Sequence, residues 1–205
     1  MALKIIQFVN EPISSNCFLL FQKGNYNDCI IIDPGSEDEN GLINKIDELN
    51  LRPIFIIITH EHFDHCWGVK ALRDRFHAKV VCSEKCSERI QSNKKNLSLF
   101  YNQKGFSLNK ADIALDGRLS WDWNDDKIEI VDTKGHTDSS ISLLIGNSIF
   151  TGDALIKGQK TITKLLTGSK IEQKETDDFF RSLKGKHYKV YPGHGEIFDL
   201  DDYDI

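Results

Sequence analysis

The residues best suited to chemistry in this chain stand together in the segment His60-Glu61-His62-Phe63-Asp64-His65. It holds three imidazoles and a carboxylate, which are groups that zinc, iron and manganese accept as ligands. The segment directly follows the apolar run at 54–58, which predicts a buried strand. Placing so many polar groups at the end of a buried strand is costly unless a positive ion binds them. The segment therefore predicts a metal site at the end of a core strand.

Three later segments have the same form, because each is a predicted strand that ends in a turn with a possible metal ligand. The ligands are His136 after the strand at 127–132, Asp153 after the strand at 148–151, and His194 after the strand at 188–191. A glycine beside each ligand allows a tight turn and a close approach of the backbone to an ion. Converging strand ends can build one site from residues that are distant in the sequence, and we expect that here.

These residues resemble the ligand pattern of the metallo-β-lactamase superfamily, and their spacing is most similar to that of its glyoxalase II-like hydrolase branch. The resemblance extends from Asp33-Pro34-Gly35 to Gly193-His194-Gly195. All seven ligand positions of the family are filled, by His60, His62, Asp64, His65, His136, Asp153 and His194. The family implies an α/β (α+β) fold, a four-layer αββα sandwich of two mixed β-sheets flanked by helices, with a dinuclear site at one edge.

The resemblance also implies how the ligands divide between two metals. The first metal would be held by His60, His62 and His136. The second would be held by Asp64, His65 and His194, with Asp153 as the bridge. Two Zn²⁺ are the expected cofactors, and iron or manganese also suits these donors. Metals about 3.5–4 Å apart can share a hydroxide and polarise a carbonyl, and Asp64 could aim that hydroxide, so Asp64 is the expected catalytic residue.

Three kinds of function are compatible with such a site. The first is a hydrolase that uses the bridging hydroxide to cleave a small ester, a thioester as in glyoxalase II, or a lactone. The second is a persulfide-dioxygenase-like oxidoreductase, with one iron on His60, His136 and Asp153. The third is a non-catalytic metal-binding module, which has the least support because no appended domain or interaction tail is visible. We predict a hydrolase.

The chain departs from the glyoxalase II pattern at three places. It ends eleven residues after His194, without the C-terminal helical region that supplies much of the thiol-substrate pocket. The stretch after Asp153 lacks the Gly-Arg element of related hydrolases, and Lys134 replaces the usual proline before Gly135. The ligands are intact, and these departures leave open whether glutathione thioesters are substrates. Three lysines after Asp153 either meet an anionic substrate or belong to a solvated loop: Lys157, Lys160 and Lys164.

Composition and charge restrict the partners. The 205 residues are 40% hydrophobic and 28% charged, as in ordinary globular proteins. This length allows a buried core, and a single domain over residues 1–205 is expected. A net charge of −5 without a long basic run argues against nucleic acid, so RNA cleavage is disfavoured. No apolar stretch approaches membrane-spanning length and no signal peptide is evident, which predicts a cytoplasmic protein and disfavours β-lactam hydrolysis. A small-molecule substrate is expected, and the oligomeric state is left open.

The cysteines predict no disulfide framework. They are five in number and scattered, which suits reduced thiols: Cys17, Cys29, Cys66, Cys82 and Cys86. A structural zinc on Cys82, Cys86 and His77 has poor spacing and lacks a fourth ligand. Cys66 follows the histidine segment and is expected to pack in the start of a helix rather than to face the metals.

The elements that must position the ligands are short strands and helices in mixed order. Strands are predicted at 4–9, 17–21, 29–33, 54–59, 79–82, 127–132, 140–145, 148–151 and 188–191. Helices are predicted at 38–50, around 69–76, at 84–92 and at 176–184, and a turn at 23–28. Residues 93–117 lack sustained periodicity, which is typical of a helical excursion or a mobile flap. This order favours two packed sheets with helices outside over a doubly wound sheet.

Overall fold

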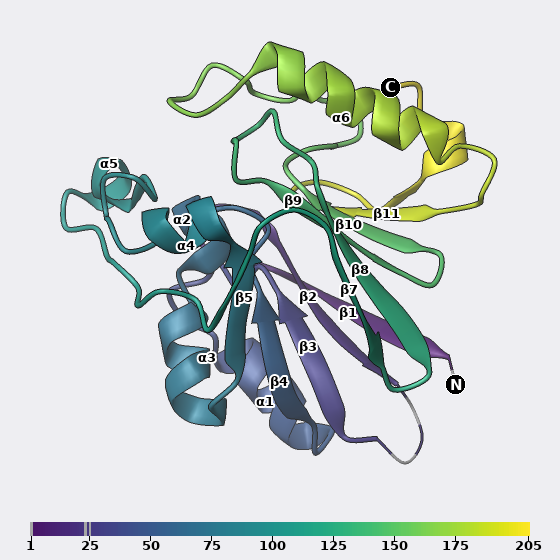
Figure 1. Cartoon of the computed structure of the whole chain (residues 1–205). Helices are drawn as coiled ribbons and strands as arrows, with labels where there is room; N and C mark the ends of the chain where they lie inside the picture. Colours follow the sequence, from purple (N-terminus) through teal and green to yellow (C-terminus); the bar gives the residue numbers. More distant parts are fainter. Residues whose placement is uncertain (1, 23, 25) are drawn as a thin grey trace. The chain divides into compact units, whose positions relative to one another are not determined.

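The predicted ligands follow strands of two six-stranded sheets: residues 60–65 follow a strand of the first, and His136, Asp153 and His194 follow strands of the second. The computed structural model describes residues 2–22, 24 and 26–205, and the chain divides into two compact units, with the boundary in the sequence between Leu115 and Asp116. Lys23 and Asn25 of the predicted turn at 23–28 lie outside the described residues. Each unit contains one mixed sheet with helices packed on it (Figure 1).

The first unit has the sheet order β1-β2-β3-β4-β5-β6. The first three strands are antiparallel and the last three continue from β3 in parallel. The strands are β1 (Leu3–Val9), β2 (Asn16–Gln22), β3 (Asp28–Ile32), β4 (Arg52–Ile57), β5 (Lys79–Ser83) and β6 (Ile113–Leu115). Since β3, β4 and β5 are parallel, the loops that leave their carboxyl ends lie at one edge of the sheet, which is where parallel sheets build their sites.

Five helices accompany this sheet: α1 (Asn40–Glu48), α2 (Phe63–Cys66), α3 (Val69–Phe76), α4 (Glu84–Arg89) and α5 (Ser98–Asn102). Leu42 and Ile46 of α1 and Leu72 of α3 share one apolar cluster with strand residues such as Leu19 and Ile31. Every residue of β2 is buried, as expected for a central strand with both faces covered. Ile58 and Cys66 also belong to this apolar cluster, so the loop that follows β4 begins and ends in the core.

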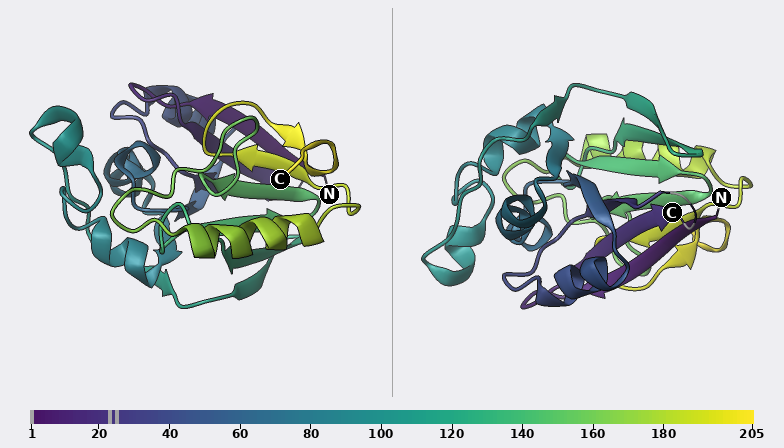
Figure 2. Two further views of the ribbon diagram at one scale, coloured as in Figure 1. Left: turned by 90° about the horizontal axis from the view of Figure 1, so that it is seen from above. Right: turned by 90° about the horizontal axis from the view of Figure 1, so that it is seen from below.

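The second unit has the sheet order β12-β11-β10-β9-β8-β7. Its strands are β7 (Leu119–Trp123), β8 (Asp126–Asp132), β9 (Ile141–Ile145), β10 (Ser148–Gly152), β11 (Lys189–Pro192) and β12 (Phe198–Asp199). Only the β10–β11 pair is parallel, and the long helix α6 (Lys170–Ser182) connects those two strands. Figure 2 shows α6 lying along this sheet. Phe180 of α6 belongs to one apolar cluster with Ile149 and Val190 of the strands. A short 3₁₀ turn, η1 (Leu200–Asp202), follows β12.

The two mixed sheets with flanking helices confirm the predicted fold class. Most predicted strands are present within one or two residues, and the hairpin at Gly146-Asn147 joins β9 to β10. The last helix was predicted too short, because it begins at Lys170 and not at 176. Residues 93–117 contain α5 and β6, and β7 and β12 also had no predicted counterpart. In the described part of the chain, no helix has the length and apolar character needed to cross a membrane.

Candidate metal centre

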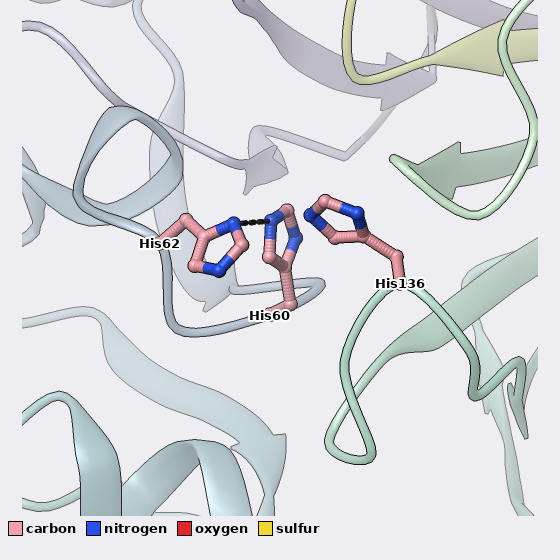
Figure 3. Close-up of side chains that lie close together, drawn as sticks. All are labelled: His60, His62 and His136. Carbon is pink, nitrogen blue, oxygen red and sulfur yellow. Dashed lines mark hydrogen bonds between the residues drawn. The ribbon is translucent and has the colours of Figure 1, made fainter. Parts of the chain in front are cut away.

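The loop after β4 brings four of the predicted ligands together, and we call His60, His62, Asp64 and His65 the first ligand group. His60 and His65 are fully buried and His62 is nearly so. His60 Nε2 lies 3.0 Å from His62 Nδ1, and Figure 3 shows this contact as a dashed line. This separation is close to the roughly 3.3 Å expected between two nitrogens on one tetrahedral zinc. Asp64 and His65 lie in the short helix α2, with His65 Nε2 3.7 Å from Asp64 Oδ2.

One buried carboxylate, that of Asp33 after β3, orients two of these imidazoles. Asp33 Oδ2 accepts a hydrogen bond from His65 Nδ1 at 3.0 Å and another from the Thr59 hydroxyl at 2.7 Å. Because the only hydrogen of that hydroxyl goes to Asp33, the Thr59 oxygen accepts from His60 Nδ1 at 3.1 Å. Both rings therefore donate from Nδ1, and in the neutral imidazole Nε2 is then the acceptor.

Small and polar residues from the segments around β1 and β3 fix the backbone of the loop. A Cβ added to Gly35 would lie only 1.6 Å from the carbonyl oxygen of Asp64, so the loop rests directly on this glycine. The Ser15 hydroxyl donates to the same carbonyl, and Asn10 Nδ2 bridges Ser15 Oγ and the carbonyl of Asp33. A side chain at position 35 would displace Asp64.

Glu61, in the same loop, is held by a partly buried ion pair and by a thiol. Glu61 Oε1 accepts from Arg89 Nη1 at 3.0 Å, and Glu61 is 1% exposed. Cys66 Sγ donates to the Glu61 carbonyl at 3.6 Å, and Cys66 is part of the core. Burial, followed by the carboxylates near it, raises the pKa of the Cys66 thiol well above its ordinary value. Cys66 is thus a packed, protonated thiol, as expected.

The second unit brings together the other three predicted ligands, and we call His136, Asp153 and His194 the second ligand group. His136 Nε2 lies 3.5 Å from Asp153 Oδ2, and His194 Nε2 lies 3.6 Å from Asp153 Oδ1. The three residues follow β8, β10 and β11, and Figure 3 draws His136 on its loop. His136 Nδ1 donates to the carbonyl of Ile162 at 2.9 Å, so its Nε2 is the acceptor. Asp153 stands between the two imidazoles.

Helix α6 holds the loops of this second group in place. The amide N–H of Ser169 donates to the Gly135 carbonyl at 2.8 Å, and the Thr176 hydroxyl donates to the Lys134 carbonyl at 2.6 Å. Gln173 Nε2 donates to the carbonyl of Ala154, the residue after Asp153, at 2.9 Å. Gly135 has a φ of +137° and lies so close to Gln173 that a Cβ would meet its Cα at 2.4 Å. The first turns of α6 and its cap therefore fix the backbone before His136 and the backbone after Asp153.

The amino-acid pattern matches one family model over almost the whole chain. The model of the metallo-β-lactamase superfamily matches residues 10–194, a range that includes all seven predicted ligands. The chain belongs to the metallo-β-lactamase superfamily. This membership confirms the resemblance stated from the ligand pattern.

Relatives of this superfamily member carry hydrolase names. A "Probable metallo-hydrolase" of Methanocaldococcus jannaschii is 30% identical over 203 residues, which are 95% of this chain and 94% of the relative. A "Hydroxyacylglutathione hydrolase" of Buchnera aphidicola subsp. Baizongia pistaciae is 32% identical over 156 residues, 76% of this chain but only 53% of that protein. The crystal structure of BLEG-1 B3 metallo-β-lactamase superposes with a TM-score of 0.84 at 25% identity, covering 96% of this chain and 94% of that one.

The donor atoms of this metallo-β-lactamase superfamily member fit a metal ion. His65 Nε2 and His136 Nε2 are both left as acceptors, and each faces a carboxylate oxygen at 3.7 and 3.5 Å. Two acceptors at such a distance repel each other unless a proton or a cation lies between them. Neutral imidazole nitrogens and carboxylate oxygens are suitable ligands for zinc, and the oxygens bound to Nδ1 are the usual outer partners of zinc-bound histidines.

Sequence reasoning did not find the residues that orient the ligands. Asp33 was interpreted as the end of a strand, and neither Thr59 nor Gln173 was singled out. A signal for Asp33 was available, since β3 and β4 are parallel neighbours and a polar residue at the end of one lies beside the loop that leaves the other. The Ile162 carbonyl has no such signal, because any residue could supply it.

The remaining candidates have ordinary roles in the structure. Lys157 Nζ pairs with Glu196 Oε1 at 2.7 Å, and its side chain is exposed. Lys160 and Lys164 are exposed on the loop before α6. The five cysteines are free and buried, and His77 ends α3 in the left-handed conformation, with a φ of 56°. Trp123 is buried and Trp121 is partly buried on β7.

Proposed function

We propose that the two ligand groups form one dinuclear zinc site and that this protein hydrolyses a small ester, thioester or lactone. One metal would take His60, His62 and His136, the other would take Asp64, His65 and His194, and Asp153 would bridge them. Each metal of such a pair requires three or four ligands. The first ligand group has four residues and the second has three, so neither group alone could hold both metals. Iron or manganese could occupy the same donors.

The observation that supports this proposal most directly is the protonation pattern of the imidazoles. Asp33, Thr59 and the Ile162 carbonyl accept from Nδ1 of His65, His60 and His136, so that Nε2 is the atom each neutral ring would offer to a cation. A carboxylate or carbonyl oxygen that accepts from Nδ1 is the usual outer partner of a zinc-bound histidine. The family model, which spans both ligand groups in one match, agrees with it.

Two divalent cations at these residues would supply a Lewis acid for the substrate carbonyl and would lower the pKa of an attacking water. The chain would contribute fixed ligands and a base. Asp64 Oδ2, on a side chain that is only 14% exposed, would accept a proton from the attacking water. A bond then forms between the water oxygen and the acyl carbon, the bond from that carbon to sulfur or oxygen breaks, and the proton passes to the leaving group.

The proposed site also restricts the class of substrate. The substrate is expected to be a small molecule, and glutathione thioesters are one class to test, because the name of one relative specifies hydroxyacylglutathione. The alignment with that relative stops at about half of its length, so its substrate does not carry over by itself. The single domain, the cytoplasmic location and the catalytic role of Asp64 stay predictions.

Metal analysis combined with two assays tests the proposal. Protein purified without added metal should contain about two zinc per chain and should hydrolyse acyl thioesters, phenyl esters or lactones. Replacing the bridge, Asp153→Asn, should leave at most one tightly bound zinc, whereas Asp122→Asn on β7 should leave both. One iron per chain with sulfur-dependent oxygen uptake would instead favour the dioxygenase alternative. Two bound zinc without any hydrolysis would favour a non-catalytic metal-binding module.

A further inference from the structure

An apolar segment lies on the surface next to the second ligand group. Among the described residues, ten large hydrophobic side chains are exposed, and four of them fall within residues 162–171. They are Ile162 at 59% exposed, Leu165 at 40%, Leu166 at 92% and Ile171 at 77%. Scattered exposed apolar residues are normal, but a concentration of this kind marks a binding surface. We call these four side chains the apolar patch.

The backbone that carries the patch is tied at both ends to the loop of His136. At one end, the Ile162 carbonyl accepts from His136 Nδ1 at 2.9 Å. At the other end, the Ser169 N–H donates to the carbonyl of Gly135 at 2.8 Å. Residues 162–169 therefore form a loop, and the two ends of this loop hold the proposed metal ligand His136 and its neighbour Gly135 in place.

The loop is pinched above this base, which places two leucines at its tip. The Gly168 N–H donates to the Leu165 carbonyl at 2.9 Å, and a Cβ on Gly168 would meet the carbonyl carbon of Thr163 at 2.6 Å. Only a glycine permits this close approach of the two sides of the loop. Leu165 and Leu166 lie between these contacts, so the fold itself holds two apolar side chains out in solvent.

The charges around the patch favour an anion. Residues 154–171 contain four lysines and no acidic residue; Lys157 pairs with Glu196, and the other three are Lys160, Lys164 and Lys170. This is unusual in a chain with a net charge of −5. Ester or thioester hydrolysis releases a carboxylate, and an apolar segment with lysines in the same stretch of sequence suits a carboxylate with an apolar chain.

From these observations we propose that the apolar patch binds the acyl chain of the substrate, and that the enzyme prefers long unbranched acyl groups over short polar ones. This inference rests on the proposed function and narrows its substrate class. Four side chains are too few for a stable protein interface, which takes about 20–30 residues on each side. They are comparable with the apolar lining of a ligand site, in which few polar groups fix the orientation. The loop that carries them contacts His136 through the Ile162 carbonyl, which favours a substrate chain as the occupant.

The first experiment measures binding and does not depend on turnover. Titration calorimetry on the zinc-loaded protein compares acetate, hexanoate and decanoate, which share a carboxylate and differ only in chain length. We expect affinity to rise about twofold per methylene, less than full burial would give, because an open patch covers only part of the chain. Equal affinity for the three anions overturns the proposal.

The second experiment measures kcat/KM for thioesters of one neutral thiol, from acetyl to decanoyl. The wild-type ratio of decanoyl to acetyl should reach about 100, and the Leu166→Ser, Ile171→Ser double variant should lower that ratio to about 10 or less. Both side chains are largely exposed, so their loss costs little folding free energy. Leu119→Ser removes another exposed hydrophobic residue of the same unit, on β7, and should leave the ratio unchanged.

The remaining outcomes separate this inference from the proposed function. Absence of all hydrolysis by protein with two bound zinc refutes the proposed function, while the decanoate titration still decides whether the patch binds a chain. Chain-length-independent kinetics refute the acyl-chain site. Binding to phosphatidylglycerol vesicles, or self-association on sedimentation, that is lost in the double variant without any chain-length effect would also refute it, in favour of a membrane surface or a second copy.

Discussion

At the scale of single residues, Asp33 has the widest influence on the candidate site, although it is not a proposed ligand. Its carboxylate accepts from His65 directly and fixes His60 through Thr59, so it supports ligands of both proposed metals. We predict that Asp33→Asn weakens zinc binding about 10- to 100-fold, the usual effect of losing an outer partner of a zinc-bound histidine. Competition with a chromophoric chelator measures this. The control Asp28→Asn, at the start of the strand that Asp33 follows and paired with exposed Arg52, should bind zinc normally.

Glu39 provides a second residue-scale prediction, because burial raises the pKa of its carboxyl from 4.5 to about 8. The neighbouring charge of Asp38 adds to this effect, and a hydrogen bond from the Ser36 N–H opposes it. The folded state therefore holds the proton more tightly than the unfolded chain does. The resulting stability is complete below about pH 4.5 and is lost as the pH rises through 8.

The variant Glu39→Gln cannot ionise and should lose this pH dependence. Relative to wild type, its free energy of unfolding should increase between pH 5 and pH 8.5, by up to about 4 kcal/mol. Urea unfolding of the zinc-saturated proteins across this range measures the difference. Glu48→Gln, on the exposed side of the same helix, should follow the wild-type curve. A constant difference between Glu39→Gln and wild type would contradict the buried, protonated carboxyl.

At the scale of elements, the ligand loop after β4 depends on a close approach that only glycine permits. Gly35→Ala would place a methyl group 1.6 Å from the Asp64 carbonyl oxygen, so the loop must move. We expect a loss of about 3 kcal/mol or more in the free energy of unfolding, together with weaker zinc binding. Gly41→Ala, inside α1 with no atom within 4 Å of the new Cβ, should instead stabilise the protein by about 0.5–1 kcal/mol. Thermal unfolding compares the two variants.

The elements also show which parts of the structure the sequence could predict. Strands such as β2 and β4 were predictable because their apolar runs are continuous and bounded by turn residues. The start of α6 could have been found from its cap, since the Ser169 side chain accepts from the Glu172 N–H, three residues later. β6 and β12 have three and two residues, which is too short for any periodicity, and only pairing with β5 and β11 makes them strands.

The candidate site follows the same division. The seven proposed ligands could be named from the sequence because their residue types and spacing are themselves the family pattern. The partners that orient them were not, because Asp33, the Ile162 carbonyl and Gln173 act through contacts between segments that lie 26 or more residues apart, or through backbone atoms. Substrate preference is still less readable, since it depends on exposed loop residues such as Leu166, whose position follows from the pinched loop and not from any motif.

At the scale of the whole molecule, the proposed metals should join the two units in one cooperative structure. In the proposed division of ligands, each metal takes residues from both sheets, so binding energy is available only when both units are folded. Removal of zinc with a chelator should lower the Tm by 10 °C or more and should broaden or split the unfolding transition. His194→Ala, which removes a single ligand, should give an intermediate Tm, and His187→Ala, a histidine whose side chain is 90% exposed, should match wild type. Calorimetry of the four samples decides this, because an unchanged, single transition after chelation would mean that the metals do not connect the units.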